Sequence, residues 1–134
     1  MTQEHKELLI KDLCARLPYG VKAQVKYPIN TNGKCAITTK EITSVNCGLD
    51  MIQAENIDII VGYYTFEVKP YLFPLSAMTI EQRQEFDSTL KYLQMEEIDI
   101  WTTSTYDWCN KNHFDYRGLI DKGLAIDATN KNIY

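Results

Sequence analysis

Histidine is scarce in this sequence and the cysteines are scattered, which argues against the commonest metal sites. Only two histidines, His5 and His113, occur among 134 residues. No two cysteines stand at C-x-x-C spacing, although the chain has four of them: Cys14, Cys35, Cys47 and Cys109. A structural zinc site needs four ligands, usually in closely spaced pairs. We therefore expect no metal and no cofactor. The cysteines should be reduced, mostly buried thiols, because disulfides require an oxidising compartment.

The signatures of common enzymes are also missing. The chain contains no P-loop, no Rossmann glycine pattern, no G-x-S-x-G and no H-E-x-x-H. Its formal net charge of −4 argues against nucleic acid as the main partner, because binding to a phosphate backbone needs clustered Lys and Arg. No apolar run approaches the length of a membrane span, and no basic flank precedes an apolar run at the N-terminus. We expect a cytoplasmic protein that does not bind membranes.

What the chain does have is the composition of a folded domain. Its hydrophobic fraction of 45% and charged fraction of 24% are ordinary for a globular protein, and its length suits one core. We therefore predict a single domain over residues 1–134.

The first half of the chain predicts one helix followed by short strands. Residues 2–17 carry leucines at helical spacing, and their charged residues, Asp12 and Arg16 included, should cover the solvent-facing side. Alternation over residues 21–27 predicts a strand with one wet face. Residues 34–39 and 41–45 predict either two strands or one bent strand, and residues 46–56 could form a helical turn or a loop. The most apolar run, residues 57–64, is predicted to be the central strand.

A proline-containing segment, residues 63–78, separates this half from the rest, and we call it the strap. Pro70 and Pro74 each fix φ and hold the preceding residue extended, so the sequence predicts a stiff connector and not a helix or a central strand. The strap also carries apolar side chains that should lie against the core: Tyr71, Leu72, Phe73 and Leu75.

Helices are predicted after the strap. Thr79 and Gln82 form a capping box that begins the first of these helices. Residues 104–107 resemble a second capping box, which would begin a helix that ends at about Asn112. Residues 96–100 are either a helix end or a short strand. Asp115 is predicted to cap a last helix over residues 116–122, which ends at a left-handed Gly123. Residues 125–134 have no strong period and should lie along the surface.

The predicted fold class is therefore α+β. An N-terminal helix precedes a small antiparallel meander of three or four strands, either open or curled toward an SH3-like barrel. Three C-terminal helices then pack on one side.

The residues that could carry chemistry form one short pair. Cys109 and His113 are four residues apart, so on a helix they would share a face and could act as a thiol–imidazole pair. Such a pair also needs an oxyanion pocket and an orienting carboxamide or carboxylate. Three residues near in sequence could orient it, although polar residues are also common at the end of an exposed helix: Asn110, Asn112 and Asp115. A small enzyme using this pair is an alternative hypothesis.

Aromatic residues are abundant, and Tyr and Trp concentrate at protein interfaces. The candidate interaction surface consists of Tyr63, Tyr64, Phe66, Trp101, Tyr106 and Trp108. The leading hypothesis is a non-enzymatic protein-binding or adaptor protein that uses aromatic and acidic residues. A third hypothesis, binding of single-stranded nucleic acid, would rely on basic residues near the predicted strands: Lys22, Lys26, Lys34 and Lys40.

Three segments resemble a family of small uncharacterised proteins from gut Bacteroidetes and their phages or mobile elements. They are residues 7–21 (ELLIKDLCARLPYGV), residues 68–79 (VKPYLFPLSAMT) and residues 114–128 (FDYRGLIDKGLAIDA). The family often has KPYLRP in the second segment, where this chain has Phe73 in place of the arginine. The resemblance implies a bacterial or phage origin but no activity. It also implies a shared scaffold in which the strap docks on the last helix: Lys69, Pro70, Tyr71, Pro74, Asp115, Tyr116 and Gly118.

Overall fold

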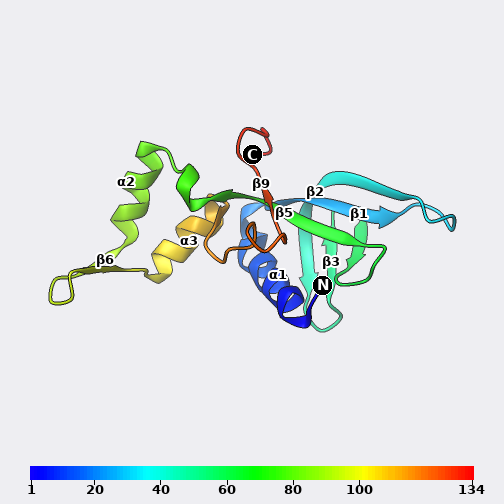
Figure 1. Cartoon of the computed structure of the whole chain (residues 1–134), viewed down its shortest axis with the longest axis horizontal. Coiled ribbons are helices and arrows are strands. Elements are labelled where there is room, and N and C mark those ends of the chain that lie inside the picture. The colour runs from blue at the N-terminus through cyan, green and yellow to red at the C-terminus, as the bar shows by residue number, and fades with distance from the viewer.

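A computed structural model describes all 134 residues, and it shows an elongated molecule with two parts. The larger part is a sheet with an N-terminal helix against it, and the smaller part is a lobe of two helices and a hairpin (Figure 1). The helices are α1 (Gln3–Arg16), η1 (Leu17–Tyr19), η2 (Leu75–Ala77), α2 (Ile80–Thr89) and α3 (Thr103–Lys111). The predicted α+β class is confirmed.

The main sheet contains seven strands in the order β4-β3-β2-β1-β5-β8, with β9 also paired to β5. These strands are β1 (Lys22–Pro28), β2 (Cys35–Asn46), β3 (Met51–Ala54), β4 (Ile57–Ile60), β5 (Glu67–Pro74), β8 (Phe114–Asp115) and β9 (Ile126–Asp127). The first four form an antiparallel meander, and β5 returns to pair antiparallel with β1. Strand β4 pairs only with β3, so the sheet is not closed by a β4–β5 ladder. The two predicted segments 34–39 and 41–45 form one long strand, β2 (Cys35–Asn46), with a bulge between Ile42 and Ser44.

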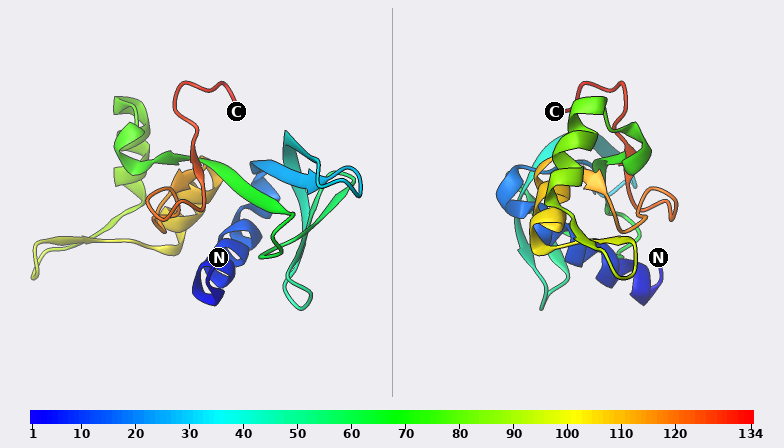
Figure 2. Two further views of the ribbon diagram at one scale, coloured as in Figure 1. Left: turned by 45° about the vertical axis from the view of Figure 1, so that its right-hand side comes forward. Right: turned by 90° about the vertical axis from the view of Figure 1, so that its left-hand side faces the viewer.

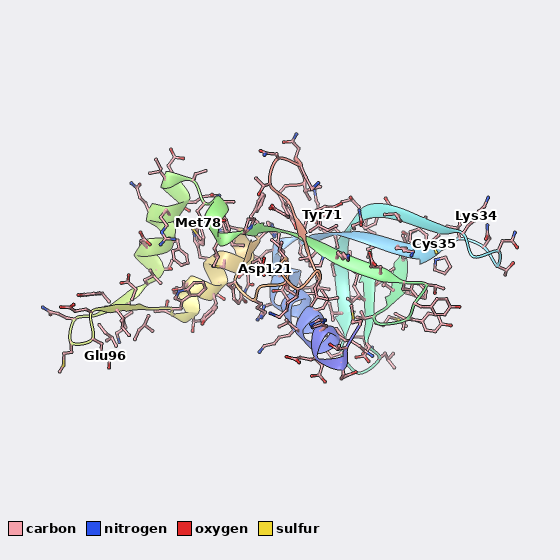
Figure 3. All side chains as sticks on the ribbon, viewed as in Figure 1. Lys34, Cys35, Tyr71, Met78, Glu96 and Asp121 are labelled. Carbon is pink, nitrogen blue, oxygen red and sulfur yellow. The ribbon has the colours of Figure 1, made fainter.

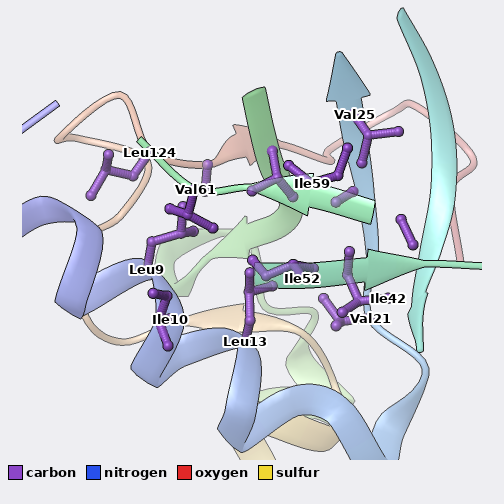
Figure 4. Close-up of a cluster of buried hydrophobic side chains, with 14 of the residues drawn as sticks. Leu9, Ile10, Leu13, Val21, Val25, Ile42, Ile52, Ile59, Val61 and Leu124 are labelled. Carbon is purple, nitrogen blue, oxygen red and sulfur yellow. The ribbon is translucent and has the colours of Figure 1, made fainter. Parts of the chain in front are cut away.

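Helix α1 begins at an N-cap, Thr2, whose side chain accepts a hydrogen bond from the backbone N–H of His5. Its leucines point into the main core, where Leu9 and Leu13 face side chains of the strands (Figure 4). The predicted helix is therefore confirmed, but its solvent-facing side is not as predicted. Asp12 and Arg16 are fully buried, because this side of α1 faces the smaller lobe.

The strap is not merely a connector, because half of it is strand β5 in the interior of the sheet. Pro70 pairs with Ala23 at the end of the β1 ladder, and Pro74 pairs with Asp115 at the end of the β8 ladder. Each proline thus lies at the end of a ladder, where its missing N–H interrupts no continuous run of hydrogen bonds. The prediction that the strap packs against the core is confirmed for Tyr71 and Leu72, which are buried.

The most apolar run is not the central strand. Its first four residues form β4, which lies at the edge of the sheet, and residues 61–66 form turns. Ile59 and Val61 are nevertheless buried in the main core, while Ile60 faces solvent. The run is apolar because alternate residues of an edge strand enter the core, and its sequence does not specify its position in the sheet.

The C-terminal third contains fewer helices than predicted. The capping box of α2 is present at Thr79 and Gln82, but the box of α3 lies at Thr102 and Thr105, two residues before the predicted start. Residues 116–122 form turns and not a helix. Gly123 has a φ of +74°, and Leu124 N–H donates to Leu119 C=O at 2.9 Å, so the predicted left-handed ending is present without the helix.

Residues 125–134 do not simply follow the surface. Ala125 and Ala128 are buried, and β9 pairs in parallel with β5. The Tyr134 hydroxyl accepts a hydrogen bond from Lys22 N–H at 2.9 Å and donates one to Tyr71 C=O at 2.8 Å. This tail is held by short stretches of backbone hydrogen bonding and not by a row of apolar side chains. Its sequence therefore shows no hydrophobic period.

Candidate functional site

The predicted aromatic surface is divided between two distant places. Tyr63, Tyr64 and Phe66 lie in the turn between β4 and β5, at the sheet end of the molecule. Tyr63 and Tyr64 are 50% and 84% exposed and lie beside a small apolar hollow of about 190 Å³. The other three aromatics belong to the smaller lobe, so the six residues do not form one surface (Figure 1).

In the smaller lobe, four side chains form a wall around an open hollow of about 440 Å³. These wall residues are Ile100, Trp101, Tyr106 and Tyr116. Trp101 and Tyr106 contact each other with ring centroids 5.2 Å apart, and Tyr106 meets Tyr116 at the same separation. Because 43% of Tyr106 is exposed, the wall is open to solvent.

Trp108, by contrast, serves mainly the core of the lobe. Its ring stacks on Phe114 with centroids 5.4 Å apart, and its Nε1–H donates to Glu85 at 3.2 Å. The buried centre of this second core consists of Phe86, Cys109 and Phe114. Phe86, which contacts both Trp108 and Trp101, connects this core to the wall.

A hairpin that we call the arm projects from the base of the wall. It consists of β6 (Lys91–Leu93) and β7 (Ile98–Ile100), joined by a turn at residues 94–97. Figure 1 and the left view of Figure 2 show it extending away from the sheet and beyond helices α2 and α3, and Figure 3 places Glu96 near its tip, at the end opposite Lys34. The two strands pair only with each other, so each keeps one free edge.

The arm exposes both apolar and acidic side chains. Tyr92 is 58% exposed, Met95 is 100% exposed and Ile98 is 46% exposed. The register pairs Leu93 with Ile98, so these two side chains share one face, and this face leads along the arm to Ile100 and the wall. The exposed acidic residues of the arm are Glu96, Glu97 and Asp99, against a single lysine at its base, Lys91.

Cys109 and His113 do not form an activated pair. No hydrogen bond connects them, and Cys109 is fully buried in the second core. Burial raises the pKa of the Cys109 thiol to about 11, so the nucleophilic thiolate is disfavoured. Burial, together with Arg16 and Lys22, lowers the pKa of His113 to about 4, so its imidazole is neutral near pH 7.

The surroundings of His113 are those of a packed residue. Its ring stacks on Tyr134 with centroids 3.7 Å apart, and its Nδ1 is buried without a hydrogen-bond partner. Its backbone has a φ of +62° and its C=O accepts a hydrogen bond from Phe73 N–H at 2.8 Å. His113 therefore helps to join the lobe to β5.

The structure brings the residues of the predicted scaffold together. Strand β5 holds Lys69, Pro70, Tyr71 and Pro74, and its last two residues pair with Phe114 and Asp115 of β8. Tyr116 and Gly118 follow directly in the chain, and the Asp115 carboxylate accepts hydrogen bonds from Leu119 N–H and Ile120 N–H. The strap thus meets the 114–118 segment through strand pairing and not through a helix.

A buried ion network lies where the two parts of the molecule meet. Arg16 Nε donates to Asp12 at 2.9 Å, and its guanidinium also donates to the backbone oxygens of Phe114 and Cys109. The other Asp12 oxygen accepts from Arg117 at 2.9 Å. Neither Asp12 nor Arg16 is exposed, so the network is a structural junction and not an accessible site.

The basic residues considered for nucleic-acid binding are partly engaged in other contacts. Lys22 Nζ donates to Ile133 C=O at 3.0 Å, and Lys40 Nζ lies 3.2 Å from a Glu55 carboxylate oxygen. Lys26 and Lys34 have no ion pair. Two of the four lysines are therefore engaged in other contacts, and two are not.

The cysteines differ from the sequence-based expectation, because only Cys109 is buried. Cys14 and Cys47 are exposed and Cys35 is half-buried, and all four are free thiols. The Sγ atoms of Cys14 and Cys47 lie 3.5 Å apart. Their sequence separation of 33 residues gave no signal of this contact.

The sequence predicts either a helix end or a short strand at residues 96–100. Residues 98–100 are strand β7, but its pairing with β6 to form the arm was not predicted. Residues 91–100 have the alternation of two short strands, but three-residue strands are too short for a reliable pattern. The acidic residues at its tip were the only signal, and they are equally typical of a solvated loop.

None of the helices combines the length and the apolar character required to cross a bilayer. No family model matches the chain, and no curated protein or solved structure shows significant similarity to it.

Proposed function

We propose that this chain is a non-enzymatic protein-binding or adaptor protein, of bacterial or phage origin and acting in the cytoplasm, that holds its partner with the arm and the aromatic wall. The origin rests on the resemblance of the three segments quoted above.

The observation that carries the proposal is the exposed arm. A two-stranded hairpin with no further packing is at best marginally stable in water. This one displays Tyr92, Met95 and Ile98 to solvent. Burying these side chains against a partner would recover the free energy of apolar burial, about 25 cal/mol per Å².

The chemistry of the arm indicates what kind of partner it suits. A free strand edge can receive an extended segment, which adds backbone hydrogen bonds to the side-chain contacts. Glu96, Glu97 and Asp99 favour a partner with basic residues around an apolar centre. The wall at the base of the arm offers aromatic rings, which are enriched at the energetic centres of interfaces.

Site-specific photo-crosslinking tests the location of the binding surface. A photoreactive phenylalanine analogue is placed at Tyr92 or Tyr106, and in separate proteins at Tyr64 and at Ile37, which is 63% exposed on β2. In extract of cells that naturally carry the chain, positions 92 and 106 should capture the same protein, and position 37 should capture none. If only position 64 captured a protein, the binding surface would lie at the turn between β4 and β5 and not at the arm.

Affinity measurements with the captured protein complete the test. The triple variant Tyr92→Thr, Met95→Gln, Ile98→Thr keeps β-forming residues in the strands but removes the apolar contacts. We expect it to bind at least about tenfold more weakly, the effect of losing interface contacts worth over ~1.4 kcal/mol. The matched variant Ile37→Thr should bind normally. Equal affinity of the triple variant would refute the proposal.

A further inference from the structure

Two thiols from distant parts of the sequence meet on the surface of the sheet part of the molecule. Cys14 lies in the last turns of α1, and Cys47 lies in the turn between β2 and β3. Their Sγ atoms are 3.5 Å apart, close enough for one thiol to donate a hydrogen bond to the other. Both residues are exposed, so small molecules and other proteins can reach them.

Both cysteines are held by ordered structure. Helix α1 is anchored by Leu9 and Leu13, which are fully buried in the main core. A second contact joins the helix to the same turn, because Lys6 Nζ lies 2.8 Å from an Asp50 carboxylate oxygen. Within the turn, the Asn46 side chain accepts a hydrogen bond from Leu49 N–H at 3.2 Å. The thiols therefore face each other as a consequence of how α1 packs.

The other two cysteines have no such neighbour. The nearest hydrogen-bonding partners of Cys35 Sγ are backbone oxygens of Gly33 and Thr65, at 4.0 and 3.9 Å. Cys109 is fully buried in the second core. Among the six ways to choose two of the four cysteines, the fold brings only one pair of sulfur atoms into contact.

We propose that Cys14 and Cys47 form a reversible disulfide that ties α1 to the β2–β3 turn. A disulfide bond is about 2.05 Å long, so the sulfur atoms must approach by roughly 1.5 Å, a distance that small side-chain rotations can cover. The bond would close a loop that runs from α1 through β1 and β2.

The reaction is thiol–disulfide exchange with a low-molecular-weight or protein disulfide as the oxidant. One protein thiol loses its proton, and the thiolate attacks the disulfide of the oxidant, forming a mixed disulfide and releasing one thiolate. The second protein thiolate then attacks the protein sulfur of the mixed disulfide and releases the second. The protein loses two electrons and two protons, and the oxidant becomes two thiols.

The electrostatics of the pair make this reaction depend on pH. Burial and the hydrogen bond to Cys47 raise the pKa of Cys14 to about 11, so this thiol is protonated at neutral pH. Because only thiolates attack disulfides, oxidation should accelerate as the pH rises above 7. Lys6 and Asp50 are the charged groups that join the two supporting elements, and their opposite charges partly cancel.

The test uses the full chain, reduced and then incubated with oxidised glutathione. Remaining thiols are blocked with N-ethylmaleimide and the protein is digested with trypsin, which cleaves after Lys and Arg. Each cysteine then lies in its own peptide: Cys14 in 12–16, Cys35 in 35–40, Cys47 in a peptide that begins at residue 41, and Cys109 in 92–111. We expect one cross-linked species that joins the first and third of these peptides, and an intact protein that has lost two maleimide adducts.

Variants and denaturant provide the controls. Cys14→Ser and Cys47→Ser should each abolish the cross-link and leave only a glutathione adduct, whereas Cys35→Ser should leave it intact. Oxidation in denaturant should give mixed pairings, since the native contact that selects one pair is lost. The oxidised native protein should melt roughly 5–10 °C above the reduced one.

Two outcomes would overturn the proposal. One is that Cys14 and Cys47 both still react with N-ethylmaleimide after oxidation of the native protein. The other is that Cys35 or Cys109 enters the cross-link as often as Cys14 does. Both outcomes are independent of whether the arm binds a partner.

Discussion

Arg16 is the residue through which the two parts of the molecule depend on each other. It lies in the last turn of α1 and donates hydrogen bonds to the backbone oxygens of Cys109 in α3 and Phe114 in β8, two residues of the second core. Asp12 compensates its charge, and Arg117 completes the network. A buried ion network of this kind contributes little if replaced as a whole, but removing Arg16 alone leaves buried polar groups without the donors that satisfy them.

We therefore predict that Arg16→Ala lowers the free energy of unfolding by about 3–5 kcal/mol. The substitution leaves the Asp12 carboxylate with one cationic partner and leaves two buried carbonyl oxygens with unfilled hydrogen-bonding capacity. Urea unfolding followed by circular dichroism measures the change. Lys11→Ala, which removes an exposed cation from the same helix, should cost under ~0.5 kcal/mol. Similar losses for both variants would contradict the role given to Arg16.

At the scale of elements, α3 depends on its N-cap more than α2 does. The Thr79 side chain satisfies only its own helix, accepting a hydrogen bond from Gln82 N–H at 3.1 Å. Thr102 caps α3 and also donates its hydroxyl to Thr89 C=O at 2.9 Å, at the end of α2. One threonine thus begins a helix and joins two helices.

The corresponding prediction compares the two caps. Thr79→Ala should cost about 1 kcal/mol, the usual value of a helix cap, and Thr102→Ala should cost about 2 kcal/mol because the Thr89 carbonyl also loses a partner. Thermal unfolding of the two variants side by side measures the difference. Thr79→Ala serves as the matched control, and an equal loss in both would mean that the bond to Thr89 contributes nothing.

Elements with a strong local signal were predictable from the sequence. The spacing of Leu9 and Leu13 gave α1, the alternation of Val21, Ala23 and Val25 gave β1, and the Thr79–Gln82 box gave the start of α2. These features depend on interactions between residues that are close in sequence, so a short stretch of the chain is enough to predict them.

Elements stabilised by distant partners were not predictable. Strand β5 contains two prolines, a pattern that predicts a connector. It forms a strand only because it pairs with β1, β8 and β9. Residues 116–122 carry an Asp115 cap signal, yet that carboxylate holds a turn. For the candidate site, composition pointed to Trp101 and Tyr106, but only the fold shows that Tyr63 and Tyr64 lie elsewhere and that the arm stands beside the wall.

At the scale of the whole molecule, the chain has two hydrophobic cores of unequal size. The main core joins α1 to the sheet, whereas the second has only three fully enclosed side chains: Phe86, Cys109 and Phe114. Small cores give low local stability, so the smaller lobe should open more readily than the sheet.

We predict that Phe86→Ala unfolds the smaller lobe selectively. Truncating this side chain removes about 3–5 kcal/mol of packing from a core of limited size. Hydrogen exchange followed by mass spectrometry should show amides of α2 and α3 exchanging at least about a hundredfold faster, with those of β1–β3 nearly unchanged. Ile80→Ala, at an 81% exposed position on α2, should leave both regions unaffected. Equal acceleration in lobe and sheet would show instead that the protein opens as one unit.

The arm leaves the lobe and returns to it at adjacent points, since Lys91 is paired with Ile100. Its sequence and length can therefore vary without displacing any residue of either core. Natural or engineered variants could acquire new binding specificity by insertion or substitution in residues 92–99. The two cores, which determine the fold, would stay unchanged.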